Sequence, residues 1–213
     1  MLPDRRRLAQ TILITSLAGA LVTLGAVLLL DRPISQWSHA HLHGMQAFLW
    51  LTRIAEPAAP LALGGACGLA VAWLCGWQPG RGGRVLLALC LATLLALGIK
   101  EELKYAIGRT WPETWTNGNP SWIGNGVFAM EPFHGGAGWA SFPSGHTSVV
   151  AAPMGVLWFA CPRWRLACVL PVFLVAIGLL GADYHWLSDI IGGSLVGMAS
   201  AVGALAAVET ERR

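Results

Sequence analysis

Long apolar runs constrain the fold of this chain more than any other feature of its sequence. Such runs lie at about 11–30, 58–77, 85–104, 147–161, 166–181 and 187–208. A helix needs roughly 20 apolar residues to cross about 30 Å of hydrocarbon. Charged residues make up only 12% of the chain, whereas about 25% is typical of a soluble domain. The sequence therefore predicts an all-α fold, a six-span transmembrane helical bundle that forms one domain over residues 1–213.

The first run and the two shortest runs refine this prediction. The run at 11–30 follows three arginines, as in a signal peptide, but it is too long for one and lacks a small-residue cleavage site before Asp31. We therefore expect it to remain as the first span. The short runs at 147–161 and 166–181 contain Pro153 and Pro171, which favour kinks in those helices.

Basic residues predict the orientation of the spans, because Lys and Arg are retained on the cytoplasmic side. With the N-terminus inside, nine of the fourteen basic residues are cytoplasmic: Arg5, Arg6, Arg7, Arg81, Arg84, Arg163, Arg165, Arg212 and Arg213. Both termini are then cytoplasmic, and the long connections at 31–57 and 105–146 lie outside. We expect a bacterial inner-membrane protein whose long loops face the periplasm.

The segment at 34–54, between the first two spans, carries apolar side chains at helical spacing, including Trp37, Phe48 and Leu51. Two interpretations remain open. The segment is either an amphipathic helix on the outer membrane surface, where aromatic side chains concentrate, or a helix packed on the bundle.

Composition excludes some functions and disfavours others. The net charge is only +3, and no Lys/Arg-rich stretch carries interleaved aromatic residues, so nucleic-acid binding is excluded. All five cysteines lie inside or at the ends of apolar runs without CxxC spacing, which is typical of small buried apolar residues. His39, His41 and His43 form a cluster without a nearby carboxylate, which is weak support for a metal site. We expect no metal and no cofactor.

Polar residues gather in three separate segments, each at the outer end of a span. The first runs from Lys104 to Pro112, after the third span, and Lys100 lies one helical turn before Lys104. These lysines are candidates for a functional site, but they equally fit side chains that extend to the membrane surface. The second is Ser141-Phe-Pro-Ser-Gly-His146-Thr147, directly before the fourth span. A turn that opens a helix presents free N–H groups and suits a phosphate, and His146 can donate a proton there.

The third segment is Asp183-Tyr-His185-Trp-Leu-Ser-Asp189, at the start of the sixth span. His185 and Asp189 are four positions apart, so on a helix they share one face. A carboxylate can then hold one imidazole nitrogen protonated and leave the other as a nucleophile or base. The alternative is a buried His–Asp pair that only stabilises the helix.

These three segments together resemble the type-2 phosphatidic acid phosphatase superfamily, whose motifs read K-x6-RP, PSGH and SR-x5-H-x3-D. Lys104 and Pro112, the Pro143–His146 sequence, and the His185–Asp189 pair match them in order. The resemblance implies that His185 attacks phosphorus to form a phosphohistidine, that Asp189 orients it and that His146 protonates the leaving alkoxide. It also implies that Lys104 and the backbone of Ser144 and Gly145 hold the phosphate oxygens, without a metal.

Two positions depart from the family motifs. Trp111 replaces the arginine of the first motif, and Leu179, preceded by Gly178, replaces the arginine of the third. Arg109 lies two residues before Trp111 and is the expected guanidinium donor to phosphate in their place.

The resulting hypothesis is a membrane lipid phosphatase with its active site at the outer face, acting on a lipid phosphate or pyrophosphate within the bilayer. Candidate substrates are undecaprenyl pyrophosphate, phosphatidylglycerophosphate, phosphatidic acid and a lipid A phosphate. Two alternatives remain open: a lipid phosphotransferase on the same site, or a non-catalytic protein that binds or translocates lipid. The sequence indicates neither the substrate lipid nor the oligomeric state.

Overall fold

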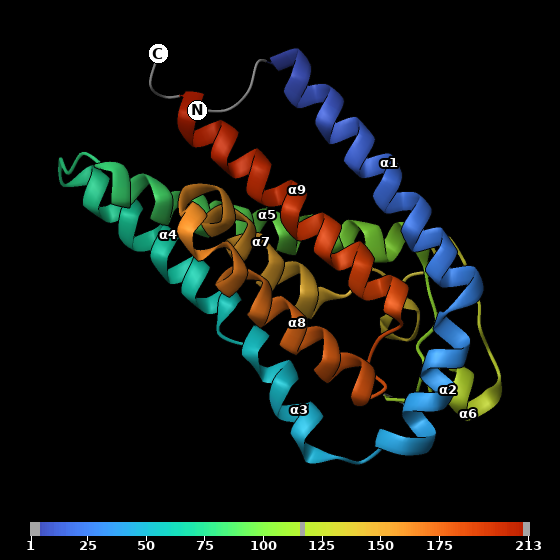
Figure 1. Ribbon diagram of the computed structural model, residues 1–213. Coiled ribbons are helices and arrows are strands. Elements are labelled where there is room, and N and C mark those ends of the chain that lie inside the picture. Colours follow the sequence, from blue (N-terminus) through green and yellow to red (C-terminus); the bar gives the residue numbers. More distant parts are fainter. Residues whose placement is uncertain (1–4, 116–117, 211–213) are drawn as a thin grey trace.

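The computed structural model describes residues 5–115 and 118–210, and these form helices joined by loops and isolated β-bridges (Figure 1). The side chains of residues 5–13, 209 and 210 are not described. The helices are α1 (Arg5–Leu29), α2 (Asp31–Leu42), α3 (Gln46–Thr52), η1 (Arg53–Ala55), α4 (Ala58–Leu74), α5 (Arg81–Ile107), α6 (Trp122–Asn125), η2 (Ala137–Trp139), α7 (Gly145–Ala160), η3 (Pro162–Trp164), α8 (Arg165–Gly181) and α9 (Leu187–Thr210).

All six predicted apolar runs lie in helices, but not all of these helices are long enough to cross a membrane. Four helical stretches within the described residues have the length and hydropathy of a span: Gln46–Leu74, Arg81–Ile107, Pro162–Gly181 and Leu187–Val208. A fifth is counted if α1 and α2, which meet at a bend of 59°, form one broken span. Helix α7 has only 16 residues. The fold is therefore a helical membrane bundle, and the count of six spans stays a prediction.

Helix α7 lies inside the bundle and contacts α5, α8 and α9. Small residues allow its backbone to approach α9 closely, as is usual between helices in membranes. A Cβ atom on Gly197 would lie 2.6 Å from the Cβ of Ala151 and 2.7 Å from the carbonyl oxygen of Ser148. This close packing places the N-termini of α7 and α9 next to each other.

The segment at 34–54 forms two helices rather than one, because the chain turns between α2 and α3 at Gly44, whose φ is +79°. Helix α3 packs against α8. A Cβ atom on Gly181 would lie 2.4 Å from the ring of Phe48, so this glycine leaves the space that the ring fills. Packing on the bundle is therefore confirmed for α3, although Trp50 on the same helix is 64% exposed.

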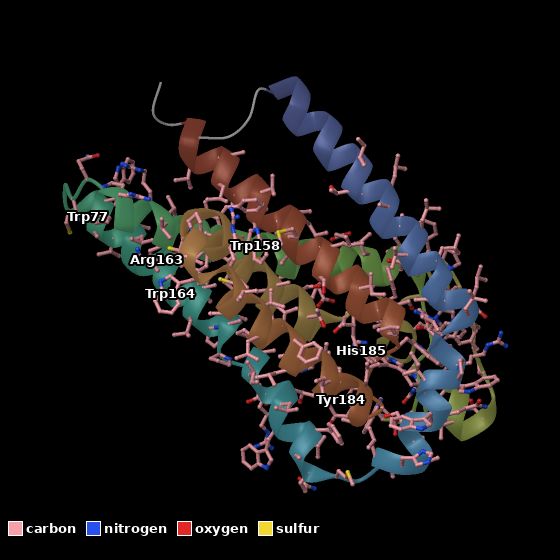
Figure 2. The ribbon with its side chains drawn as sticks, viewed as in Figure 1. Trp77, Trp158, Arg163, Trp164, Tyr184 and His185 are labelled. Carbon is pink, nitrogen blue, oxygen red and sulfur yellow. The ribbon has the colours of Figure 1, made fainter. Side chains whose placement is uncertain are left out.

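The bundle has two chemically different ends (Figures 1 and 2). The first residues of α1 and the last of α9 lie at one end, whereas α2, α3 and α6 lie at the other. Trp77 and Arg163, in or beside the short connections, lie toward the former, and His185 and Tyr184 lie toward the latter (Figure 2). The long connections and the polar segments therefore meet at the end opposite the short basic connections.

Candidate active site

The loop after α5 folds back across the end of that helix and brings the first two polar segments together. Gly108 ends α5 in the left-handed conformation, with φ +56° and its amide bonded to the carbonyl of Lys104. A Cβ atom there would lie 1.8 Å from the carbonyl oxygen of Glu131, so only glycine fits. The amide of Ser141 then donates to the carbonyl of Arg109 at 3.1 Å. The start of α7 is thereby held beside the end of α5.

Ser144 caps the N-terminus of α7. Its hydroxyl accepts from the amide and the hydroxyl of Thr147, at 3.4 and 3.1 Å, and its own amide donates to the carbonyl of Asp189 at 3.0 Å. The Ser144 side chain and amide are thus used within the protein. The next amides, of Gly145 and His146, belong to the first turn and have no intrahelical acceptor. A helix start of this kind attracts an anion.

Lys100 lies against this turn. A Cβ atom on Gly145 would be 3.2 Å from Cδ and 3.6 Å from Nζ of Lys100. The Lys100 ammonium is also paired with Glu101, and its side chain is only 12% exposed. The one-turn spacing of Lys100 and Lys104 predicted that both lie on one face, although only Lys104 was expected to hold phosphate.

His185 and Asp189 make the expected contact, with His185 Nδ1 3.2 Å from Asp189 Oδ2. His185 lies in the turn between α8 and α9, before the helix on which it was expected. The same carboxylate oxygen accepts from the Trp186 amide at 3.2 Å and from the Ser141 hydroxyl at 2.5 Å. As an acceptor, Asp189 favours the tautomer with a proton on Nδ1, which leaves Nε2 unprotonated.

Arg109 occupies a position that differs from the expected phosphate ligand. It is 1% exposed, and its guanidinium donates to Asp189 Oδ1 at 2.6 Å, to Asp31 Oδ2 at 2.6 Å and to the Ser188 hydroxyl at 2.5 Å. Asp31 Oδ1 also accepts from the Ser188 amide at 2.9 Å. Arg109 therefore pairs with two buried carboxylates behind His185.

Asp31 was not identified from the sequence as part of the site. It is 1% exposed and begins α2, directly after the first apolar run. The signal that marks it is a carboxylate at the end of an apolar helix, where burying a charge is costly unless a partner is present.

The two positions that depart from the family motifs have apolar and aromatic surroundings. The Trp111 ring lies 5.0 Å from the His185 ring, and its N–H donates to the carbonyl of Ala137 at 2.8 Å. Leu179 is fully buried in a cluster with Val149, Val150 and other apolar side chains. Neither residue offers a free hydrogen-bond donor to a bound anion.

Four groups that can carry positive charge converge at the start of α7. The His146 and His185 rings are 6.4 Å apart. Burial, followed by the charges of His185, Lys104 and Lys100, lowers the pKa of His146 to about 4. Burial also lowers the pKa of His185, although Asp189 opposes this shift. Both histidines are therefore neutral near pH 7, and the two lysines make the site attractive to an anion.

An open apolar cavity of about 800 Å³ lies between α1, α5 and α9. Its lining includes Leu103 and Ile107, which flank Lys104, and Phe142 and Gly192 near Ser141 and Asp189. The cavity thus extends from the membrane-facing side of the bundle to the edge of the charged site.

Comparisons with known proteins match the part of the chain that holds the polar segments of the site. The family profile of the PAP2 superfamily matches residues 85–213. A lipid A 1-phosphatase of Rhizobium etli is 33% identical over 95 residues, which are 45% of this chain and 38% of that protein. A lipid A 1-phosphatase of Rhizobium johnstonii is 32% identical over 95 residues, 45% of this chain and 36% of that protein. The matched segment thus spans little more than a third of each relative.

A solved structure shares the fold. The crystal structure of Aquifex aeolicus LpxE aligns with a TM-score of 0.54 and 18% sequence identity, covering 83% of this chain and 95% of that chain. Since the aligned share of the chain exceeds residues 85–213, part of the chain outside the family match also has a counterpart in this fold.

The Arg109 network predicts a large stability effect at Asp31. Asp31→Asn should lower the free energy of unfolding by about 1 to 3 kcal/mol, because the amide nitrogen is a donor where Arg109 and Ser188 need an acceptor, so buried donors are left without a partner. Chemical unfolding in detergent measures the change. Glu56→Gln is the matched control, since Glu56 is 65% exposed and lies 3.8 Å from Arg53, and it should change stability by less than about 0.5 kcal/mol. A similarly small effect of Asp31→Asn would contradict the network.

Proposed function

The chain belongs to the PAP2 superfamily, and on this premise we propose that it is a membrane enzyme that hydrolyses a lipid phosphate through a phosphohistidine intermediate. One observation carries the proposal. The ring of His185, with Nδ1 held by Asp189, lies 6.4 Å from the ring of His146. His146 follows Gly145 in the first turn of α7, against which Lys100 lies. A nucleophile, a proton donor and an anion site are thus close enough to contact one phosphoryl group.

In the first step, the Nε2 lone pair of His185 attacks phosphorus and the bond from phosphorus to the lipid oxygen breaks. His146 gives its proton to the leaving alkoxide. Asp189 stabilises the positive charge that forms on the His185 ring. In the second step, neutral His146 removes a proton from water, the resulting hydroxide attacks phosphorus, and the phosphorus–nitrogen bond breaks to release inorganic phosphate.

Phosphate binding is assigned to a set of donors without an arginine. Lys100 and Lys104 supply positive charge, and the amides of Gly145 and His146 supply directed hydrogen bonds. Arg109 is a positioning residue, because its guanidinium contacts Asp189 rather than the phosphate site. This assignment replaces the expectation that Arg109 and the Ser144 amide hold phosphate.

The apolar cavity supports a lipid as the substrate. It runs from between α1 and α9 to Phe142, where an acyl chain can lie while its phosphate reaches Lys104. Two relatives are named lipid A 1-phosphatases. We therefore rank the 1-phosphate of lipid A first among the substrates to test.

The direct test is phosphate release by the detergent-purified protein from lipid A, phosphatidic acid, phosphatidylglycerophosphate and undecaprenyl pyrophosphate. His185→Ala should reduce release by at least about 1000-fold, because the nucleophile is lost. Transfer of phosphate to a second lipid instead of water would identify a phosphotransferase. No release from any lipid by folded protein would favour lipid binding without catalysis, and unchanged release by His185→Ala would overturn the mechanism.

The general-acid role of His146 predicts a dependence on the leaving group. His146→Ala should slow release from a lipid phosphate by about 100- to 10,000-fold, because an alkoxide leaves poorly without a proton. An activated aryl phosphate, whose leaving group needs no proton, should react nearly as fast as with the unaltered protein. Equal losses on both substrates would contradict the role.

The pH dependence of kcat/KM distinguishes the roles of the two histidines, because His185 and His146 act in opposite protonation states. His185 acts unprotonated, so a lowered pKa preserves its activity to a pH below the ordinary value of about 6.5. His146 acts protonated, so with a pKa of about 4 the free enzyme loses competence as the pH rises from 5 to 8. With an aryl phosphate as substrate, this decline should be absent in His146→Ala. The same substrate serves for the unaltered protein, so ionisation of the substrate does not account for the difference.

We further place both termini in the cytoplasm and the active site on the periplasmic face of a bacterial inner membrane. The support is that Arg163 lies in the short connection before α8, at the end of the bundle opposite His185 (Figure 2). Arg165 begins α8, and Arg81 and Arg84 lie in the first turn of α5, directly after the other short connection. Arg212 and Arg213, which contributed to this prediction, lie outside the described residues.

A membrane-impermeant thiol reagent tests this orientation in intact cells. In a chain whose exposed Cys67 and Cys75 are replaced by serine, the reagent should label Glu131→Cys and should not label Gly82→Cys. Both positions are exposed, so burial does not account for a difference. Labelling only of Gly82→Cys would invert the topology.

A further inference from the structure

Four side chains from three distant parts of the chain converge beside the active site. His39 and His43 lie one turn apart at the end of α2, Glu113 follows Pro112 in the loop after α5, and Asp183 lies in the turn between α8 and α9. One ligand atom from each of these residues lies within 4.8 Å of all the others. The sequence showed the histidines without a carboxylate, because Glu113 and Asp183 are remote in the chain.

Three distances in this cluster are close to those expected around a single ion. His39 Nδ1 lies 3.0 Å from Asp183 Oδ2 and 3.1 Å from Glu113 Oε2, and His43 Nδ1 lies 3.2 Å from the same Asp183 oxygen. Four ligands placed about 2.0 to 2.1 Å from a tetrahedral zinc ion are about 3.3 Å from one another. Three of the six separations among the four ligand atoms therefore come close to the edges of such a tetrahedron.

Hydrogen bonds alone would leave at least one of these contacts shared or unmade. A ring nitrogen carries at most one hydrogen, yet His39 Nδ1 faces two carboxylate oxygens from different residues. His39 and His43 both direct Nδ1 toward one oxygen of Asp183. A cation at the common point would contact all four atoms with their lone pairs directed toward it.

Asp183 provides a separate indication of a missing positive partner. Its side chain is fully buried, and Oδ1 has no hydrogen-bond partner within the described part of the chain. A buried carboxylate is stable only when it is paired and its oxygens are satisfied. Arg109, the buried arginine of the site, is already bonded to Asp31 and Asp189.

We propose that His39, His43, Glu113 and Asp183 bind one zinc ion. Two imidazole nitrogens and two carboxylate oxygens are a ligand set that zinc accepts in tetrahedral geometry. Four protein ligands leave no open position, so the ion has a structural role and takes no part in phosphoryl transfer. Each imidazole binds through an unprotonated Nδ1 and keeps its hydrogen on Nε2.

The position of the ion defines what it stabilises. Asp183 lies two residues before His185, and Glu113 lies two residues after Trp111, whose ring is 5.0 Å from that of His185. Zinc would therefore link α2 to the segment that contains His185 and to the segment that contains Trp111, whose ring contacts that of His185. Its effect on turnover rests on the proposed function, whereas its binding does not.

The test is metal content and cobalt spectroscopy of the full-length protein in detergent. After removal of metal and reloading with ZnCl₂, the protein should retain one zinc per chain. Reloading with Co²⁺ should produce the visible absorption of a tetrahedral site. The double variant with His39→Ala and His43→Ala should bind zinc more weakly by at least about 100-fold, because losing even a group that only orients a ligand costs 10- to 100-fold.

His41→Ala is the matched control. His41 lies on the same helix, but its Nδ1 is 2.8 Å from the carbonyl of Trp37 and its ring stacks on that of Trp37. It should bind zinc like the unaltered protein. Glu113→Gln, which leaves both histidines in place, should still fold and should change the cobalt spectrum.

Addition of EDTA should lower the Tm of the unaltered protein and of His41→Ala, and should leave the Tm of the double variant unchanged. An unaltered protein that retains no zinc and gives no cobalt absorption would overturn the site. A chain that binds zinc but releases no phosphate would overturn only the proposed function.

Discussion

The guanidinium of Arg109, buried between Asp189 and Asp31, is the interaction on which the site depends. It joins the loop after α5, the start of α9 and the start of α2 at one point. Two carboxylates in a low-dielectric interior are stable there because they share this cation. Asp189 is thereby left with one oxygen for His185, so the ring orientation follows from the network.

This network also explains how a PAP2 site can exist without the two motif arginines. Trp111 packs against the His185 ring, and Leu179 belongs to the apolar core. In the proposed site, positive charge for an anion comes from Lys100 and Lys104, and directed N–H groups come from the start of α7. Burial and the neighbouring positive groups lower the pKa of His146. Under the proposed function, the negative charge of a bound phosphate restores the proton of His146 and so couples binding to acid catalysis.

Helix α2 has a larger part in the site than its sequence suggests. Its first residue, Asp31, belongs to the Arg109 network, and His39 and His43 near its end face Asp183. The whole helix lies outside residues 85–213, which match the PAP2 profile. The bend of 59° after α1 turns α2 across the end of the bundle, so a segment beyond the family match closes one side of the catalytic end.

The sequence by itself determined the features that depend on neighbouring residues. Apolar runs predicted the helices, the Ser144–Gly145 turn predicted the start of α7, and the four-residue spacing predicted the contact between His185 and Asp189. Only the tertiary structure decided the partners of Arg109, the approach of Lys100 to Gly145, and the meeting of His39 with Asp183, 144 positions away. Local spacing restricts the backbone, because hydrogen bonds and burial act within a few turns. A long charged side chain can instead reach any group that folding brings near, and its partner depends on which buried charges lie within reach and are unpaired.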